Sequence, residues 1–167
     1  MSKQQSSLEK KREKLIERGI IKEDLLENIN HQLNSPHGFA LNLCGHCTAR
    51  CNYCPQSFEE YPEKYLDTDI VNKLLDEVRD CPCYFQFGTR GENLLHPSFS
   101  EVVFAIKKSN PLHYVTFHTN GLLMKEEGFV LKVLSSGMDQ LVFSLQSINP
   151  EIYTALTNNP SLDEVLD

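Results

Sequence analysis

The sequence predicts an α/β fold, a partial (βα) barrel with about four strand–helix units. One observation is that short apolar segments alternate with longer segments in which apolar residues recur at helical spacing. Another is that the short segments are rich in aromatic and β-branched residues, which suit a sheet covered by helices. Strands that alternate with helices are typical of parallel βα units. Because a closed parallel barrel has about eight such units, four of them predict only part of a barrel.

The four strands are expected at residues 39–43, 84–87, 114–118 and 141–145. The third is followed by Asn120–Gly121, a dipeptide that is typical of turns. In parallel βα folds, ligands bind beyond the carboxyl ends of the strands. We therefore expect functional residues in the segments that follow these strands.

Helices are expected at residues 68–78, 98–108 and 126–135, with a further helix beginning at about 150. Their starts carry local signals. Ser98 and Glu101 have the spacing of a capping box. Asn149 is a favoured N-cap residue, and the proline that follows it suits the first helical position.

The chain is expected to divide into an N-terminal helical extension, residues 1–36, and a core domain, residues 37–167. Residues 25–33 carry leucine and isoleucine at helical spacing, which predicts an amphipathic helix. Pro36 then interrupts that pattern. An amphipathic helix usually faces a core, so the extension is expected to pack against the core domain.

The last residues predict a core domain that is truncated at its C-terminus. Ser161 and Glu164 have the spacing of another capping box, and apolar residues follow before the chain ends at Asp167. A helix this short is marginal by itself. We expect a piece of a longer barrel; a C-terminus that simply frays is the alternative.

Composition narrows the function classes. The net charge is −7 and the pI about 5.4, so there is no strong nucleic-acid signal, which would be a basic face. No apolar run approaches the ~20 residues of a membrane span, and the polar N-terminus does not resemble a secretory signal. The expected location is therefore cytoplasmic. Thiols stay reduced there, and clustered cysteines are then more often metal ligands than disulfides.

Four of the six cysteines lie in one run, at Cys44, Cys47, Cys51 and Cys54. Two CxxC pairs could hold structural zinc, but zinc pairs are normally separated by ~12–20 residues, and only three residues separate these. A ferredoxin-type cluster uses a C-x2-C-x2-C-x3-C-P run, from which the gaps here differ. A third interpretation omits Cys44. Three thiolates would then hold a cubic 4Fe–4S cluster and leave its fourth iron open for chemistry.

The spacing Cys47-x3-Cys51-x2-Cys54, with Tyr53 before the last cysteine, resembles the signature of the radical S-adenosylmethionine (SAM) superfamily. The signature follows the first strand of that family's barrel, and the strand expected at 39–43 fits that position. The resemblance runs from about residue 39 to the C-terminus. It implies a partial (βα) barrel of the radical SAM type, with Cys47, Cys51 and Cys54 as ligands of a 4Fe–4S cluster.

Further segments resemble the same family, in order and each after an expected strand. Gly91–Glu92 is similar to the glycine–glutamate segment that binds the SAM amino group, for which a carboxylate is a suitable partner. Residues 119–121 match a turn often found there, and Ser144 corresponds to a contact with the SAM ribose or carboxylate. Tyr53 is expected to pack near SAM.

Three positions depart from the family pattern. Arg90 stands where a glycine is usual, so it could hinder close backbone approach or instead bind a substrate anion. Asn93 stands where proline is usual. Cys44 stands where a small polar residue is more common, and it is expected to be a spare buried thiol, like Cys81 and Cys83 near the second strand.

The resemblance implies an enzyme that binds a 4Fe–4S cluster and S-adenosyl-L-methionine. Such an enzyme cleaves SAM reductively to a 5′-deoxyadenosyl radical, which takes a hydrogen atom from a substrate. An external one-electron donor is implied. The substrate, a peptide or a small molecule, is not identified by the sequence. The alternative is a non-catalytic zinc or Fe–S module, or an inactive truncated fragment.

Overall fold

The computed structural model describes residues 10, 13–14, 16–19, 36–59 and 61–166. By its contacts the chain forms two compact units, Met1–His37 and Gly38–Asp167. Most of residues 1–36 lie outside the described residues, so a helical extension there, and its packing against the core domain, stay predictions.

The second unit contains a sheet of parallel strands, as the sequence predicted. The strands are β1 (Gly38–Leu41), β2 (Tyr84–Phe87), β3 (Tyr114–Thr119) and β4 (Gln140–Phe143). Their order in the sheet is β1-β2-β3-β4, and each pairs in parallel with the next. The α/β fold of about four βα units is therefore confirmed.

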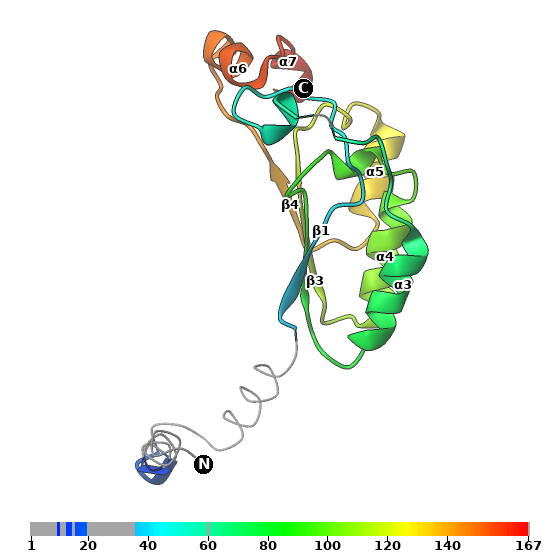
Figure 1. Ribbon diagram of the computed structural model, residues 1–167, viewed down its shortest axis with the longest axis vertical. Coiled ribbons are helices and arrows are strands. Elements are labelled where there is room, and N and C mark those ends of the chain that lie inside the picture. The colour runs from blue at the N-terminus through cyan, green and yellow to red at the C-terminus, as the bar shows by residue number, and fades with distance from the viewer. Residues whose placement is uncertain (1–9, 11–12, 15, 20–35, 60, 167) are drawn as a thin grey trace. The chain divides into compact units, whose positions relative to one another are not determined.

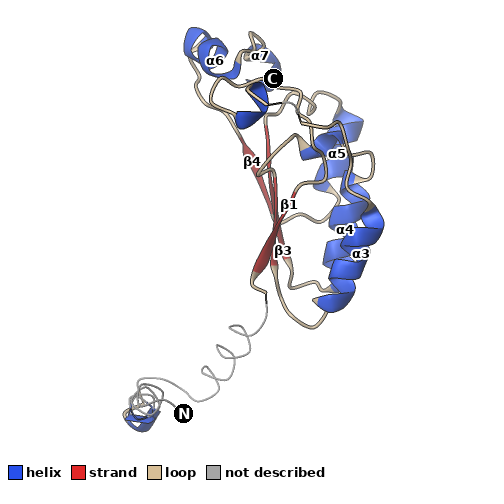
Figure 2. Ribbon diagram, viewed as in Figure 1, coloured by secondary structure: helices blue, strands red, loops and turns tan. Residues whose placement is uncertain are grey.

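Helices connect successive strands and cover one face of the sheet (Figures 1 and 2). This layer contains α3 (Thr68–Glu77), α4 (Phe99–Ser109) and α5 (Glu127–Leu134). After β4 come α6 (Pro150–Thr157) and the short α7 (Asp163–Leu166). Short 3-10 helices, η1 (Pro55–Ser57) and η2 (Asn93–Leu95), follow the cysteine run and Glu92. No helix of the described residues is long and apolar enough to cross a bilayer.

The core lies between the sheet and this helical layer. Alternate strand residues point into it, and the phenylalanines Phe85, Phe87 and Phe117 are fully buried. Each such side chain stabilises the fold by roughly 1.5–3 kcal/mol. The opposite face of the sheet is more open: Tyr84 and Tyr114 stack there with ring centroids 5.8 Å apart and remain partly exposed. The sheet is thus firmly anchored on its helical side.

Of the two N-cap residues expected at Asn149 and Ser98, one makes capping hydrogen bonds and the other does not. Asn149 caps α6 as predicted, since its side-chain oxygen accepts from the backbone N–H groups of Glu151 and Ile152. Ser98 occupies the N-cap of α4 but makes no side-chain capping hydrogen bond, so the capping box there was wrong. Glu101 instead pairs with Lys132 of α5, 3.0 Å away.

Strand β1 ends two residues earlier than expected, for a structural reason. The backbone N–H of Leu43 donates to the side-chain oxygen of Asn93, 2.6 Å away, rather than to a neighbouring strand. Asn42 likewise accepts from the backbone N–H of Arg90 and the hydroxyl of Thr89. These bonds turn the chain out of the sheet and into the cysteine loop, residues 42–67.

Candidate functional site

A cavity of about 240 Å³ lies at the carboxyl ends of the strands. The segments after all four strands contribute to it, as expected for ligand sites of parallel βα folds. Its lining includes all seven residues that the sequence analysis proposed for cluster or SAM binding. These are Cys47, Cys51, Tyr53, Cys54, Gly91, Glu92 and Ser144.

Three thiols of the cysteine loop face this cavity, and the fourth does not. Cys47, Cys51 and Cys54 are all partly exposed and belong to the lining. Cys44 is buried, 1% exposed, outside that lining, and its Sγ lies 3.1 Å from Nδ1 of His46. Cys44 is thus a buried thiol, as expected, and it is separate from the other three.

This arrangement gives no support to a structural zinc site. Among the described residues, no three His, Cys, Asp or Glu side chains are placed to hold a single metal ion. A zinc ion would need its sulfur ligands about 2.3 Å away on all sides. Three thiolates that bind different irons of one cubic cluster do not have to meet at a point. The donor set therefore fits an Fe–S cluster better than zinc.

Gly91 packs tightly against the cysteine loop. Its φ is +69°, a conformation that favours glycine, and an added Cβ would lie 2.9 Å from the carbonyl oxygen of His46 and closer still to that of Cys44. The next residue, Glu92, donates its backbone N–H to the His46 carbonyl at 2.8 Å. The glycine therefore allows the loop after β2 to lie directly on the cysteine loop.

Gln56 joins the same two segments and was missed by sequence reasoning. Its side chain is 6% exposed. It donates to the carbonyl oxygen of Gly45 at 2.8 Å and accepts from the backbone N–H of Gly91 at 3.1 Å. Nothing in the local sequence distinguishes this residue, because its partners lie 11 and 35 positions away.

Glu92 is a buried carboxylate held by hydrogen bonds. One oxygen accepts from the Thr119 hydroxyl and the Asn120 backbone N–H, each at 3.0 Å, and the other from the Leu94 backbone N–H at 3.3 Å. Burial raises the pKa of this carboxyl, and the hydrogen bonds oppose that rise. In the part of the chain that the structure describes, no cationic side chain forms an ion pair with it. A cation beside a buried carboxylate of this kind would offset the cost of burying its charge.

The remaining expected residues differ in their exposure. Tyr53 is 55% exposed at the cavity. Ser144 is half-buried, and its backbone N–H donates to the Thr119 carbonyl at 2.7 Å. The Arg90 guanidinium lies over the ring of Tyr61, 5.6 Å from its centroid, and donates to that hydroxyl at 3.3 Å. Arg90 is therefore held by a neighbouring tyrosine, although the residue also borders the cavity.

Asn93 has a structural role that explains one departure from the family pattern. Its fully buried side chain accepts from Leu43 at the end of β1, a bond that a proline side chain could not make. His118, on β3, also lines the cavity. The hydrogen-bonding role of Asn93 could not be predicted from the sequence, because its partner lies 50 positions away.

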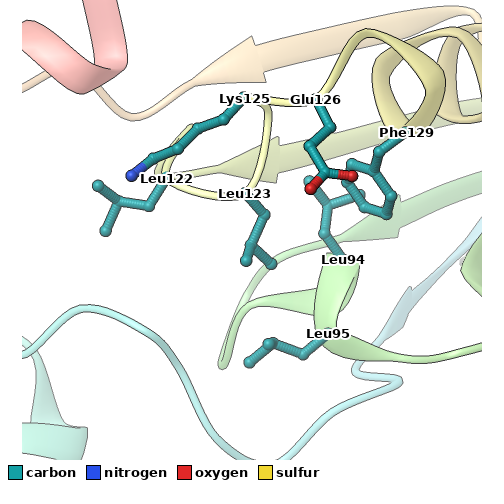
Figure 3. Close-up of a pocket in the computed structure, with 7 residues that line it drawn as sticks. All are labelled: Leu94, Leu95, Leu122, Leu123, Lys125, Glu126 and Phe129. Carbon is teal, nitrogen blue, oxygen red and sulfur yellow. The ribbon is translucent and has the colours of Figure 1, made fainter.

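A larger cavity, of about 420 Å³, lies next to the candidate site and contains none of the expected residues. It is mostly apolar, and Figure 3 shows Leu94, Leu123 and Phe129 gathered around it. Leu94 and Leu95 belong to η2, and the other lining residues follow the turn at Asn120–Gly121.

The comparisons with known proteins agree with this geometry. Residues 41–167 match the model of the Radical SAM superfamily. A GTP 3′,8-cyclase of Limosilactobacillus fermentum is 28% identical over 130 residues, which are 76% of this chain and 39% of that protein. A tungsten-containing aldehyde ferredoxin oxidoreductase cofactor-modifying protein of Pyrococcus furiosus is 32% identical over 108 residues, 63% of this chain and 29% of that protein.

Solved structures show the same fold at low identity. BtrN in complex with AdoMet and 2-DOIA gives a TM-score of 0.61 at 19% identity, over 69% of this chain and 47% of that one. Streptococcus suis SuiB bound to S-adenosylmethionine gives 0.62 at 16% identity, over 92% of this chain and 39% of that one. The chain spans less than half the length of the curated relatives named above.

Proposed function

This chain is a member of the radical SAM superfamily, and we propose that it carries the part of a radical SAM enzyme that binds the cluster and SAM. The cofactors of that family are a 4Fe–4S cluster and S-adenosyl-L-methionine. The observation that carries the proposal is the meeting, at one cavity, of three thiols and a buried carboxylate that has no cationic partner among the described residues. Soft thiolates suit iron, and the carboxylate suits an ammonium group.

Cys47, Cys51 and Cys54 would hold three irons of the cluster. They come from one loop whose backbone is ordered locally, since the N–H of Cys54 donates to the carbonyl of Cys51 at 2.9 Å and η1 begins directly afterwards. Cys44 would not be a ligand, because it is buried away from the cavity. The fourth iron would then have no protein ligand.

Glu92 and Gly91 would bind the amino group of SAM. Among the described residues, the Glu92 oxygen that faces Leu94 accepts one hydrogen bond, a long one of 3.3 Å, so it retains capacity for a further donor. An ammonium beside this buried carboxylate would supply the charge compensation that its surroundings lack. Tyr53 and Ser144, which line the same cavity, would orient the rest of the SAM molecule.

When cluster and SAM are bound, the chemistry they supply in this family is a 5′-deoxyadenosyl radical, formed by reductive cleavage, for hydrogen abstraction from a substrate. The chain's own residues would position the reactants and exclude water. The buried phenylalanines of β2 and β3 would anchor these strands to the helical layer, and the hydrogen bonds to Glu92 would hold its carboxylate in one position. An external one-electron donor would be required, and the cytoplasm is the compartment that we propose.

The substrate is proposed to depend on parts of the enzyme beyond those that bind the cofactors. The proteins that this chain resembles differ in their partners. GTP appears in the name of one relative, and another is named as a cofactor-modifying protein. The solved structures contain 2-DOIA in BtrN and the precursor peptide SuiA in SuiB. A cofactor site shared by proteins with such different partners cannot by itself select one of them.

The test is anaerobic reconstitution with iron and sulfide, followed by reduction with SAM and an assay for 5′-deoxyadenosine. We expect about four irons per chain in the wild type and in Cys44→Ala, and loss of the cluster in Cys51→Ala. Each variant removes one cysteine sulfur from the same loop, so the comparison distinguishes a thiol that binds the cluster from one that does not. Retention of stoichiometric zinc in place of iron, or equal iron loss in both variants, would sink the proposal.

A further inference from the structure

Asn120 connects the end of β3 to the cysteine loop through its side chain. Its amide nitrogen donates to the Thr48 hydroxyl at 3.0 Å and to Sγ of Cys47 at 3.5 Å. Both partners lie more than 70 positions away in the sequence. The sequence predicts only a turn at Asn120, so this contact is a feature of the folded chain.

Two further bonds fix the direction of the Asn120 amide. Its side-chain oxygen accepts from the Leu122 backbone N–H at 3.0 Å, which occupies the oxygen in a local turn. The Asn120 backbone N–H donates to the buried Glu92 carboxylate at 3.0 Å. With oxygen and backbone both engaged, the NH₂ group is the part of the side chain left to face Cys47. The donor is therefore held in place before any ligand binds.

We infer that Asn120 is a positioning residue whose side-chain N–H group donates to the Cys47 thiolate of the bound cluster and raises the cluster's reduction potential. The Sγ of Cys47 stands here for an iron-bound thiolate sulfur. Hydrogen bonds to the sulfurs are one of the levers that set the potential of Fe–S clusters. A donor stabilises the more negative, reduced cluster more than the oxidised one, so its removal makes reduction harder. The inference rests on the proposed function.

The experiment compares wild-type protein with Asn120→Ser, both reconstituted anaerobically and titrated by spectroelectrochemistry without SAM. A serine hydroxyl can still accept from the N–H two residues on, but it is too short to reach Cys47. We expect the ratio of reduced to oxidised cluster at a fixed potential to fall about tenfold, which is a shift of about 59 mV for one electron. Asn120→Asp, which replaces the donor by an anionic oxygen, should shift the potential further in the same direction.

Asn52→Ser is the matched control. Asn52 lies in the same cysteine loop, beside Cys51, but its side chain donates to the carbonyl oxygen of Ala155 at 2.6 Å rather than to sulfur. Its backbone bond to Leu156 would remain. The potential of this variant should equal that of the wild type. An equal shift in both variants would attribute the effect to loop disturbance and overturn the inference.

The outcomes separate this inference from the proposed function. A wild type that takes up no cluster would overturn both, whereas a loaded Asn120→Ser protein with unchanged potential would overturn the inference alone. If Asn120→Ser assembles no cluster, pulsed EPR of the reduced wild type with ¹⁵N-labelled asparagine side chains decides the matter. We expect a ¹⁵N coupling that persists in Asn52→Ser; its absence from the wild type would overturn the inference.

Discussion

Gly91 shows how one residue determines the distance between two loops at the site. Its positive φ and the carbonyl oxygens of the cysteine loop leave no room for a Cβ. A side chain at this position would have to push the loop after β2 away from the loop that carries the thiols. The glycine of the family's SAM-binding segment thus has a packing role here as well as the proposed binding role.

Gly91→Ala is expected to destabilise the protein by at least about 2 kcal/mol, since the left-handed backbone is costly with a Cβ and the clash adds to it. Gly128→Ala is the control. Gly128 lies in α5 with open space around it, so alanine there should stabilise by up to about 1 kcal/mol. Chemical denaturation of both variants measures the difference. Similar free energies of unfolding for the two would contradict the assigned role of Gly91.

At the scale of single residues, the sequence predicted which residues line the cavity better than it predicted which residues hold the surrounding loops in place. The cysteines, Glu92 and Ser144 carry chemistry that their residue types reveal, and each follows a strand. Gln56 and Asn93 act through partners 30 to 50 positions away. A single sequence contains no signal for such pairs, because the contact exists only once the strands are aligned.

At the scale of elements, local signals predicted the helices and strands to within one or two residues, and the errors lie at their ends. Capping depends on side-chain geometry as well as residue type. Asn149 and Ser98 are both favoured N-cap residues, yet only Asn149 makes the capping bonds. The pattern could predict where a helix begins, but it could not predict which side chain would turn toward the backbone.

Asn149→Ala should therefore lower the free energy of unfolding by about 1 kcal/mol, the usual loss for an N-cap that makes its bonds. Ser98→Ala should change it by less than about 0.5 kcal/mol, as expected for a substitution that removes no such bond. Denaturant titration at neutral pH measures both. An equal loss in the two variants would mean that Ser98 caps α4 in solution.

At the scale of the whole molecule, the seven expected site residues meet because parallel strands end at one edge of the sheet. That consequence of topology could be predicted from the alternation of strands and helices. The amino ends of the strands, at the opposite end of the sheet, are stabilised by other residues. His113, which is fully buried, accepts from the Cys83 backbone N–H at 3.0 Å just before β2.

Stability should fall in acid because of His113. Burial, together with the nearby charge of Lys107, lowers the pKa of this histidine. The unfolded chain therefore binds a proton near its ordinary pKa of about 6.5 when the folded chain does not. Below that pH the free energy of unfolding should decrease, by up to about 1.4 kcal/mol per pH unit, until the folded pKa is reached.

The measurement is urea denaturation from pH 5 to pH 7.5 for the wild type and His113→Asn. The asparagine can still accept a hydrogen bond but does not titrate. The wild type should lose more stability than the variant on acidification. Parallel pH profiles for the two proteins would show that His113 does not contribute to the acid sensitivity.

Contacts with other segments determine the shape of the cysteine loop. The three proposed ligands lie in one short segment of the cysteine loop, which contacts Gly91, Glu92 and Asn120 from other segments. Asn52 also joins this loop to α6. The cysteine segment therefore depends on contacts with the rest of the domain. Grafted onto a foreign scaffold, residues 44–57 would transfer the thiols without the groups that orient them. Transplanting the chemistry would require the edge of the sheet as well.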